Sequence, residues 1–188
     1  MKKLNEEVSR IKGMMKITEN KQTYDYGCAM LYFGEELIKE IVPMIDPEDL
    51  YIEGDGFGME MEPHCTLLYG LHKEVDTPTI ENITNKYTYN SCKYHNPSCF
   101  NNEKYDVLKY DISGDALSDV NKDLTGLPHT TDYPNYHPHM TIAYLKPGTG
   151  EKYVNKLKDT HSDGFLHPQH IIYSKPDGSK DTINITQD

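Results

Sequence analysis

The sequence of 188 residues contains no tryptophan and only four cysteines, which lie far apart and form no Cys-x-x-Cys pair. Zinc knuckles and dense disulfide frameworks need closely spaced cysteines, so we expect neither, and the four thiols should be reduced. Positive charge is also scarce, because 19 lysines and arginines stand against 30 aspartates and glutamates. The net charge of −11 argues against binding long duplex nucleic acid through a broad basic surface. A nucleotide ligand should therefore be small or a chain end.

Long apolar runs are missing as well. No stretch approaches the roughly 20 apolar residues that span a bilayer, so we expect no membrane partner. The start of the chain, MKKLNEE, does not lead into the apolar core of a signal peptide, which predicts a cytoplasmic protein. Hydrophobic residues make up 36%, but 15 tyrosines add apolar area to the core. The length suits one domain and leaves the oligomeric state open.

The apolar patterns predict a short helical extension followed by one domain. Residues 4–15 place apolar side chains at helical spacing, so residues 1–24 are expected to form the extension and residues 25–188 the domain. Strand patterns cover residues 26–33, 60–71, 105–113, 139–145, 169–174 and 181–185, and helix patterns cover 35–45, 79–87, 115–124 and 151–158. This alternation predicts an α+β fold, mostly antiparallel, in two similar lobes. Residues 54–58 are expected to form a turn, and residues 91–102 and 127–136 loops.

One short motif occurs twice in the chain. Pro63–Tyr69 reads PHCTLLY and Pro138–Tyr144 reads PHMTIAY, so both follow the pattern Pro-His-x-Thr-apolar-x-Tyr. Given the first copy, chance would produce a second with a probability of about one in a thousand. The repeat therefore indicates two matched sites, one in each half of the domain.

Strand geometry indicates which of these side chains share a face. In a strand, residues i and i+2 point to one side, so His64 with Thr66, and His139 with Thr141, should face a common cleft. The same alternation places the motif tyrosines, Tyr69 and Tyr144, on the opposite, helix-packed side.

Two histidines and two threonines suit in-line attack at a phosphodiester. One neutral imidazole takes a proton from water or a 2′-hydroxyl, while the other, protonated, gives one to the leaving oxygen. The hydroxyls of Thr66 and Thr141 can donate to the non-bridging oxygens as charge builds there. We therefore predict His64, Thr66, His139 and Thr141 as the catalytic residues, and the scheme requires no metal.

With two His-x-Thr motifs about 75 residues apart, the chain resembles the two-histidine (2H) phosphoesterases, the superfamily of 2′-5′ RNA ligase-like proteins and cyclic phosphodiesterases. The resemblance covers roughly residues 26–185. It implies a bilobal α+β fold with pseudo-twofold symmetry, one motif per lobe on adjacent central strands, and metal-independent cleavage of 2′,3′-cyclic, 2′-5′ or 3′-5′ phosphodiesters. Members include bacteriophage anti-CBASS nucleases, which destroy cyclic oligonucleotide immune signals and act in the host cytoplasm.

The substrate remains open at this level. The leading hypothesis is a phosphodiesterase that cleaves a small cyclic or 2′-5′/3′-5′-linked oligonucleotide, such as a cyclic oligonucleotide immune signal. One alternative is an enzyme that acts on 2′,3′-cyclic phosphates at RNA ends, and another is a binding module that sequesters a nucleotide without cleaving it. Two intact proton-transfer groups argue against a pure binder.

Loop residues are the candidates for substrate binding. Tyr94, Tyr133 and Tyr136 lie in the two predicted loops and could stack on a base. Lys73 and Lys146 follow the motif strands and could screen a phosphate, although a solvated loop lysine is the alternative. The histidines at 137, 139, 167 and 170 could be read as metal ligands, but no acidic residue or cysteine stands at a recognised spacing around them. We expect no metal or other cofactor.

Overall fold

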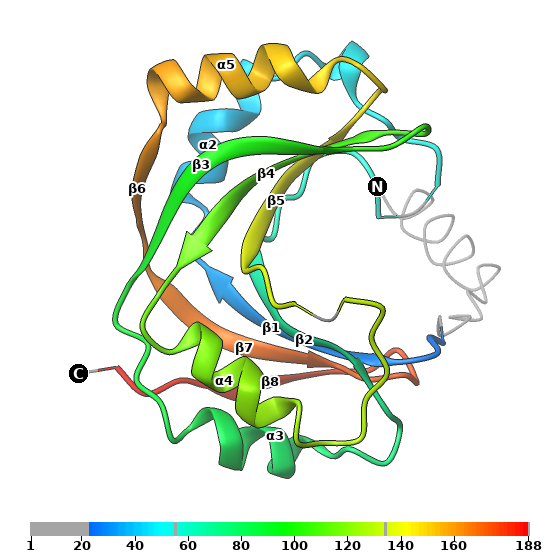
Figure 1. Cartoon of the computed structure of the whole chain (residues 1–188), viewed down its shortest axis with the longest axis vertical. Coiled ribbons are helices and arrows are strands. Elements are labelled where there is room, and N and C mark those ends of the chain that lie inside the picture. The colour runs from blue at the N-terminus through cyan, green and yellow to red at the C-terminus, as the bar shows by residue number, and fades with distance from the viewer. Residues whose placement is uncertain (1–22, 55, 134, 188) are drawn as a thin grey trace, which may run out of the picture.

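The computed structural model describes residues 23–54, 56–133 and 135–187. The helix predicted over residues 4–15, and nearly all of the predicted extension, lie outside these residues. Within the described part, two four-stranded antiparallel sheets form the domain (Figure 1). The first sheet has the order β2 (His64–Leu71), β1 (Gly27–Phe33), β7 (Pro168–Ser174) and β8 (Lys180–Asn184). The second has the order β5 (His139–Leu145), β4 (Asp106–Ser113), β3 (Cys92–Asn101) and β6 (Asp163–Leu166).

The two sheets are built alike, and their matching edges meet. The strand that carries the His-x-Thr motif is an edge strand in each sheet, β2 in the first and β5 in the second. These two strands lie side by side near the centre of the molecule (Figure 1). Buried residues of both sheets belong to one hydrophobic core. The predicted α+β fold with two similar lobes is confirmed.

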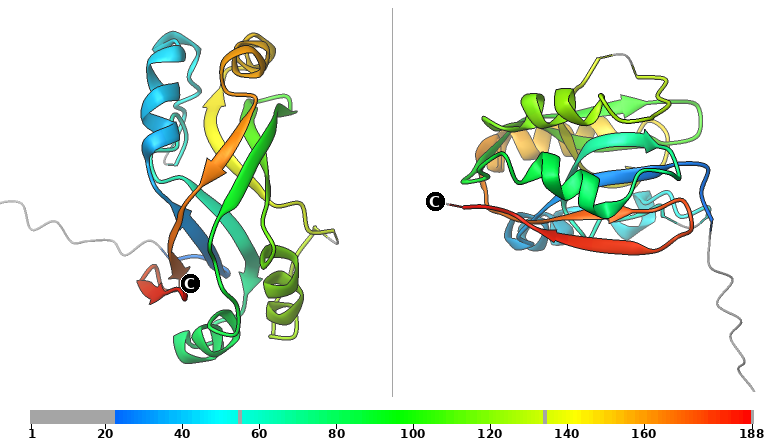
Figure 2. Two further views of the ribbon diagram at one scale, coloured as in Figure 1. Left: turned by 90° about the vertical axis from the view of Figure 1, so that its left-hand side faces the viewer. Right: turned by 90° about the horizontal axis from the view of Figure 1, so that it is seen from below.

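The helices gather in two pairs at opposite ends of the molecule (Figures 1 and 2). Helix α2 (Glu36–Ile41) follows β1 of the first sheet but lies beside α5 (Gly150–Thr160), which packs on the second sheet. Helix α4 (Leu117–Leu124) follows β4 of the second sheet but packs on β2, beside α3 (Thr77–Thr84). Each lobe therefore receives a helix from the other, which ties the lobes together. No helix in the described ranges is long and apolar enough to cross a membrane.

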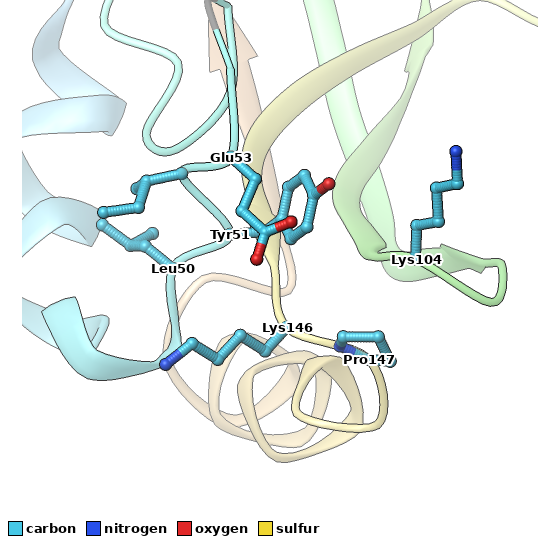
Figure 3. A pocket seen from close by; sticks show the side chains of 7 residues that line it. Leu50, Tyr51, Glu53, Lys104, Lys146 and Pro147 are labelled. Carbon is cyan, nitrogen blue, oxygen red and sulfur yellow. The ribbon is translucent and has the colours of Figure 1, made fainter.

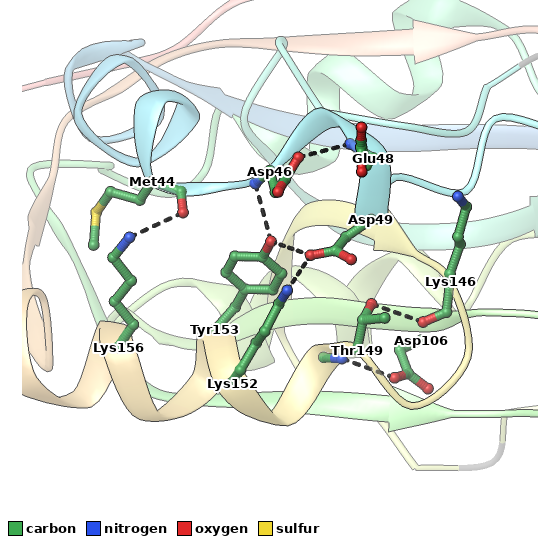
Figure 4. Close-up of polar contacts among 11 residues, drawn as sticks. Met44, Asp46, Glu48, Asp49, Asp106, Lys146, Thr149, Lys152, Tyr153 and Lys156 are labelled. Atoms are coloured by element: carbon green, nitrogen blue, oxygen red, sulfur yellow. Dashed lines mark hydrogen bonds and ion pairs between the residues drawn. The ribbon is translucent and has the colours of Figure 1, made fainter.

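Polar contacts fix the segment after α2 onto α5 (Figure 4). This segment contains two short 3-10 turns, η1 (Val42–Met44) and η2 (Pro47–Asp49). The Tyr153 hydroxyl accepts a hydrogen bond from the Asp46 amide at 2.9 Å and donates one to the Asp49 carboxylate. Lys156 Nζ donates to the Met44 carbonyl at 3.1 Å. This segment is therefore fixed beside α5, and the residues that follow it run along the edge of β5.

The segment predicted as a loop over residues 91–102 is strand β3, so that prediction was wrong. Its sequence, CKYHNPSCFN, does not show a strand pattern because polar residues and Pro97 interrupt the apolar alternation. The structure accommodates the proline in a bulge between His95 and Ser98, where Asn96 adopts a left-handed backbone with φ of 53°. Proline is found in strands at such bulges, where its missing amide hydrogen is not needed.

Both motif strands contain a β-bulge at the same place. In β2 the register slips after Thr66, so Leu67 and Leu68 both point into the core. In β5 it slips after Thr141, and Ile142 and Ala143 are both buried. Because a bulge inserts one residue, the side chains beyond it change face relative to simple alternation.

The bulges place the motif tyrosines on the same face as the histidines. Tyr69 is directly opposite Cys28 of β1, which shares a face with the partner of Thr66, and its side chain is 48% exposed. Tyr144 is opposite Val107 of β4 and contacts the rings of Phe57 and Tyr105 at 5.1 and 5.5 Å. The prediction that Tyr69 and Tyr144 lie on the helix-packed side was therefore wrong.

Each bulge exposes a carbonyl group that the edge of the sheet cannot pair, and each carbonyl has a dedicated donor. The Asn121 side chain of α4 donates to the Leu67 carbonyl at 2.6 Å. The Glu60 amide donates to the Ile142 carbonyl at 2.9 Å. These hydrogen bonds stabilise the bulged form of each motif strand, because an unpaired carbonyl in a partly buried position is unfavourable.

Replacement of Asn121 should test this role of the bulge. Asn121→Asp keeps the size of the side chain but turns its amide donor into a carboxylate that faces the Leu67 carbonyl. We expect a loss of about 2 kcal/mol in the free energy of unfolding, measured by urea denaturation at pH 7. Asn82→Asp on the exposed face of α3 is the matched control and should change stability by less than about 0.5 kcal/mol. Equal midpoints for the two variants would contradict the role assigned to Asn121.

Candidate active site

In the first sheet, the motif lies against two residues of β1. His64 pairs across the strands with Tyr32, and Thr66 pairs with Met30, so these four side chains share one face, which we call the motif face of this sheet. The His64 and Thr66 side chains are partly exposed, while Cys65 between them is buried. The alternation predicted for this part of the motif is therefore present.

In the second sheet, the residues opposite the motif are charged. His139 pairs with Asp111 of β4 and Thr141 pairs with Lys109, and these four side chains form the motif face of this sheet. Met140 between the two motif residues is fully buried. The backbone arrangement is thus repeated, whereas the charge beside it is not.

The two imidazole rings are held in the same way. His64 Nδ1 donates to the Glu62 carbonyl at 2.8 Å, and His139 Nδ1 donates to the His137 carbonyl at 2.8 Å. A carbonyl oxygen can only accept, so Nδ1 carries the hydrogen in both rings. In the neutral form of each ring, Nε2 is then left with a free lone pair for proton transfer.

His139 lies in an environment that disfavours its protonated form. Burial is the largest effect and lowers the pKa of His139 from 6.5, and the positive charges of Lys109 and His64 lower it further. The His137 carbonyl and the Asp111 carboxylate act in the opposite direction without reversing the shift.

Aromatic rings surround both histidines. The Tyr32 ring is stacked between His64 and His170, with 5.3 Å between ring centroids on each side. The Phe100 ring of β3 meets the His139 ring edge to face at 5.3 Å. These contacts restrict the orientations of the two imidazoles, and Phe100 remains 46% exposed at the surface.

The loop between α4 and β5 closes the open edge of β2. The His72 amide donates to the Pro128 carbonyl at 3.0 Å, and the Thr130 amide donates to the Gly70 carbonyl at 2.9 Å. A glycine is required at residue 70, because its φ is +95° and a Cβ would lie 1.8 Å from the Thr130 carbonyl oxygen. This loop ends at His137, whose carbonyl orients His139, so it links the first motif strand directly to the second motif.

The structure separates the three tyrosines predicted to stack on a base. Tyr94 is buried in the core against Tyr110, so its face is not available to a ligand, which corrects that expectation. The Tyr136 hydroxyl donates to the Thr66 carbonyl at 3.0 Å, so Tyr136 anchors the loop to the motif strand. Tyr133 is 77% exposed on the same loop and remains a candidate for substrate contact.

The two predicted lysines are exposed and lie beyond the far ends of the motif strands. Lys146 is seven residues from His139 along β5, a separation of roughly 20 Å at 3.3 Å per residue. It lines a pocket of about 480 Å³ together with Lys104, Tyr51 and Glu53 (Figure 3). Lys73 lies two residues beyond the end of β2. Neither lysine lies beside its motif histidine.

Sequence reasoning missed Phe100, which contacts His139, and four residues of the two motif faces, namely Met30, Tyr32, Lys109 and Asp111. A signal existed for the last two, because Lys109 and Asp111 alternate with three buried apolar residues within one strand. Polar side chains on one face of an otherwise buried strand indicate a functional surface. Within residues 23–54, 56–133 and 135–187, no three His, Cys, Asp or Glu side chains form a group that could hold a metal ion.

The chain was compared with known families and solved structures. A family model described as "Anti-CBASS protein Acb1" matches residues 59–171, which include both motifs. A solved structure titled "Crystal structure of phosphoesterase" aligns with a TM-score of 0.51 at 11% sequence identity, covering 87% of this chain and 99% of that one. A second, titled "Crystal structure of E.coli LigT complexed with phosphate", gives a TM-score of 0.47 at 11% identity, covering 88% and 100%. No curated protein matches the sequence.

The environment of His139 makes a direct prediction about its titration. Because burial and the nearby positive charges oppose protonation, the His139 ring should titrate below the ordinary pKa of 6.5. Ring signals followed by NMR from pH 4 to 9, with the His139→Gln variant used to assign them, give the value. A His139 ring that titrates at or above 6.5 would contradict the electrostatic description of this site.

Proposed function

The chain belongs to the family of the anti-CBASS protein Acb1 and is an enzyme of the two-histidine phosphodiesterase type, and from this premise we propose that it hydrolyses a cyclic oligonucleotide immune signal without a metal ion. The observation that carries this proposal is the pair of matched His-x-Thr strands. The contact between these two edge strands supports the proposal that their two imidazoles and two hydroxyls act on one phosphate. The net charge of −11 suits a small ligand better than a long polyanion.

The hydrogen bonds at the two rings support proton transfer at Nε2. With each Nδ1–H held by a backbone carbonyl, a ring can change its charge at Nε2 without moving. The hydroxyls of Thr66 and Thr141 lie two residues from the histidines on the same faces, where they can donate to the two non-bridging oxygens of a phosphodiester. As the phosphorus–oxygen bond to the nucleophile forms, charge grows on these oxygens and the donors stabilise it.

The unequal surroundings of the histidines assign their roles. The lowered pKa of His139 keeps this ring neutral near pH 7, so His139 accepts the proton of the attacking water or 2′-hydroxyl. His64, in its protonated form, donates a proton from Nε2 to the leaving oxygen as the second phosphorus–oxygen bond breaks. Each ring transfers one proton, which leaves His139 protonated and His64 neutral, and proton exchange with solvent water restores both rings before the next turnover.

Single substitutions at the motif residues should separate catalysis from binding. We expect His64→Ala and His139→Ala each to lower kcat at least about 10³-fold, and Thr66→Val and Thr141→Val to lower it about 10- to 100-fold. Product formation is measured by chromatography with a panel of cyclic dinucleotides, cyclic trinucleotides, 2′-5′ oligoadenylate and 2′,3′-cyclic nucleotides, in the presence of EDTA.

His167→Ala is the matched control. His167 is exposed in the turn between β6 and β7, so its replacement should leave activity unchanged.

The panel of nucleotides also distinguishes the alternative functions. Ligand that is bound but recovered intact would support a sequestering protein instead of an enzyme. Cleavage of 2′,3′-cyclic ends alone would support RNA-end processing, and activity lost on chelation would overturn the metal-independent mechanism.

The assignment of His139 as the base predicts the pH dependence. Protonation of His139 removes the base, so kcat/KM should fall on the acid side, with an apparent pKa below 6.5. Steady-state rates of the wild-type enzyme between pH 4.5 and 8 give this limb. Activity that rises as the pH falls below 6 would show that His139 acts in its protonated form and would reverse the two roles.

A further inference from the structure

The two motifs are symmetric in sequence, but the residues opposite them differ in charge. On the first sheet, Thr66 faces Met30 across the strands, whereas on the second sheet Thr141 faces Lys109. A buried lysine is rare because removing an ammonium group from water is costly, so its position calls for a specific partner. The Lys109 side chain is only 8% exposed. A positive charge is therefore fixed beside one of the two motif threonines.

The Lys109 ammonium is held in place by neighbours on the motif face. It forms an ion pair and hydrogen bond with the Asp111 carboxylate and lies 4.7 Å from the centre of the Phe100 ring. The Asn96 side chain, presented by the left-handed bulge of β3, donates to the other oxygen of Asp111 at 2.6 Å. Burial acts to raise the pKa of Asp111, but the hydrogen bonds from Lys109 and Asn96 outweigh it and lower the pKa, which favours the carboxylate form.

A hydrogen-bond donor without a partner lies next to this lysine. Ser98 of β3 pairs across the strands with Lys109, so Thr141, Lys109 and Ser98 form a row across three neighbouring strands of the second sheet. The Ser98 hydroxyl oxygen is buried and has no hydrogen-bond partner among the described residues. Buried hydroxyls are normally paired, so an unpaired one in this row indicates a place for a ligand atom.

We propose that Lys109 is a catalytic residue that binds a non-bridging oxygen of the scissile phosphate, with Ser98 donating a hydrogen bond beside it. This assignment rests on the proposed function, because it takes the substrate to be a phosphodiester. In the free enzyme Asp111 balances the charge of Lys109. When an anionic phosphate occupies the site next to Thr141, the ammonium turns from Asp111 toward the phosphate oxygen, and Asn96 retains the carboxylate.

A fixed positive charge at this position stabilises the transition state more than the bound substrate. A phosphodiester carries one negative charge, and its oxygens gain charge as the nucleophile adds, so a fixed cation contributes most at that point. The described part of the chain contains no arginine. Lys109 is the lysine that faces a motif threonine across the strands, so it is the fixed positive charge closest in register to the motif.

Opposite effects of two substitutions test the assignment. Lys109→Met copies the residue that faces Thr66 and removes the charge, so binding of inorganic phosphate should weaken about 10-fold or more. Asp111→Asn frees the ammonium from its counter-ion, so phosphate binding should tighten several-fold. Lys109→Arg should keep part of the affinity. Lys93→Met, which removes an exposed lysine paired with Asp163 on the same sheet, is the matched control and should bind phosphate like the wild type.

Phosphate affinity is measured by titration calorimetry. The value of kcat is measured with the nucleotide that the panel identifies as the substrate, and Lys109→Met should lower it about 10²- to 10³-fold. Thermal unfolding of each variant reports its folding. If Lys109→Met binds phosphate like the wild type, or if Asp111→Asn weakens binding as Lys109→Met does, the pair is only structural and the proposal is overturned. If Lys109→Met does not fold, the Asp111→Asn variant still decides, because tighter phosphate binding supports the proposal and weaker binding overturns it. A protein that binds phosphate through Lys109 but cleaves no nucleotide would contradict the proposed function and not this binding site.

Discussion

The bulge in each motif strand is the constraint on which the arrangement of the site depends. With simple alternation, the histidine and threonine of each motif would share one face and the motif tyrosine would lie on the other. The residue inserted by the bulge reverses the face of the tyrosine, so that His64, Thr66 and Tyr69 share a face, as do His139, Thr141 and Tyr144. The bulges persist because their carbonyls are paired, one by a helix side chain and the other by the backbone of the segment that follows α2. The helix layers therefore support the site through specific hydrogen bonds as well as through packing.

The strands beside the two motifs explain why we propose different chemical roles for two motifs of the same sequence pattern. The repeat of backbone and motif gives both imidazoles an Nδ1–carbonyl hydrogen bond and a free Nε2. The neighbouring strands then differ, with Met30 and Tyr32 on one side and Lys109 and Asp111 on the other. Acid–base catalysis needs one ring of each protonation state at the same pH. Burial of His139, together with the positive charge of Lys109 beside it, supplies the asymmetry that symmetric strands lack.

The sequence predicted the parts of the site that depend on local pattern. The repeated motif led to the fold that the structure has, and it predicts His64, Thr66, His139 and Thr141 as the catalytic residues. Strand β3 was not predicted because Asn96 and Pro97 interrupt its apolar alternation. The bulge that accommodates these two residues depends on pairing with a neighbouring strand, which the local sequence does not reveal. The motif bulges left a signal that alternation alone overlooked, namely the consecutive apolar pairs Leu67-Leu68 and Ile142-Ala143. The facing of Lys109 and Thr141 depends on strand register, which no local pattern specifies.

If the proposed function is right, the two His-x-Thr strands bind one phosphate between them. A crystal structure of the wild-type protein with a hydrolysis-resistant phosphorothioate analogue of the cleaved nucleotide tests it most directly. We expect one phosphorus group with its non-bridging atoms within hydrogen-bonding distance of the Thr66 and Thr141 hydroxyls, and with His64 Nε2 and His139 Nε2 on opposite sides of it. A phosphate bound to only one motif, or at the pocket beside Lys146, would contradict the claim.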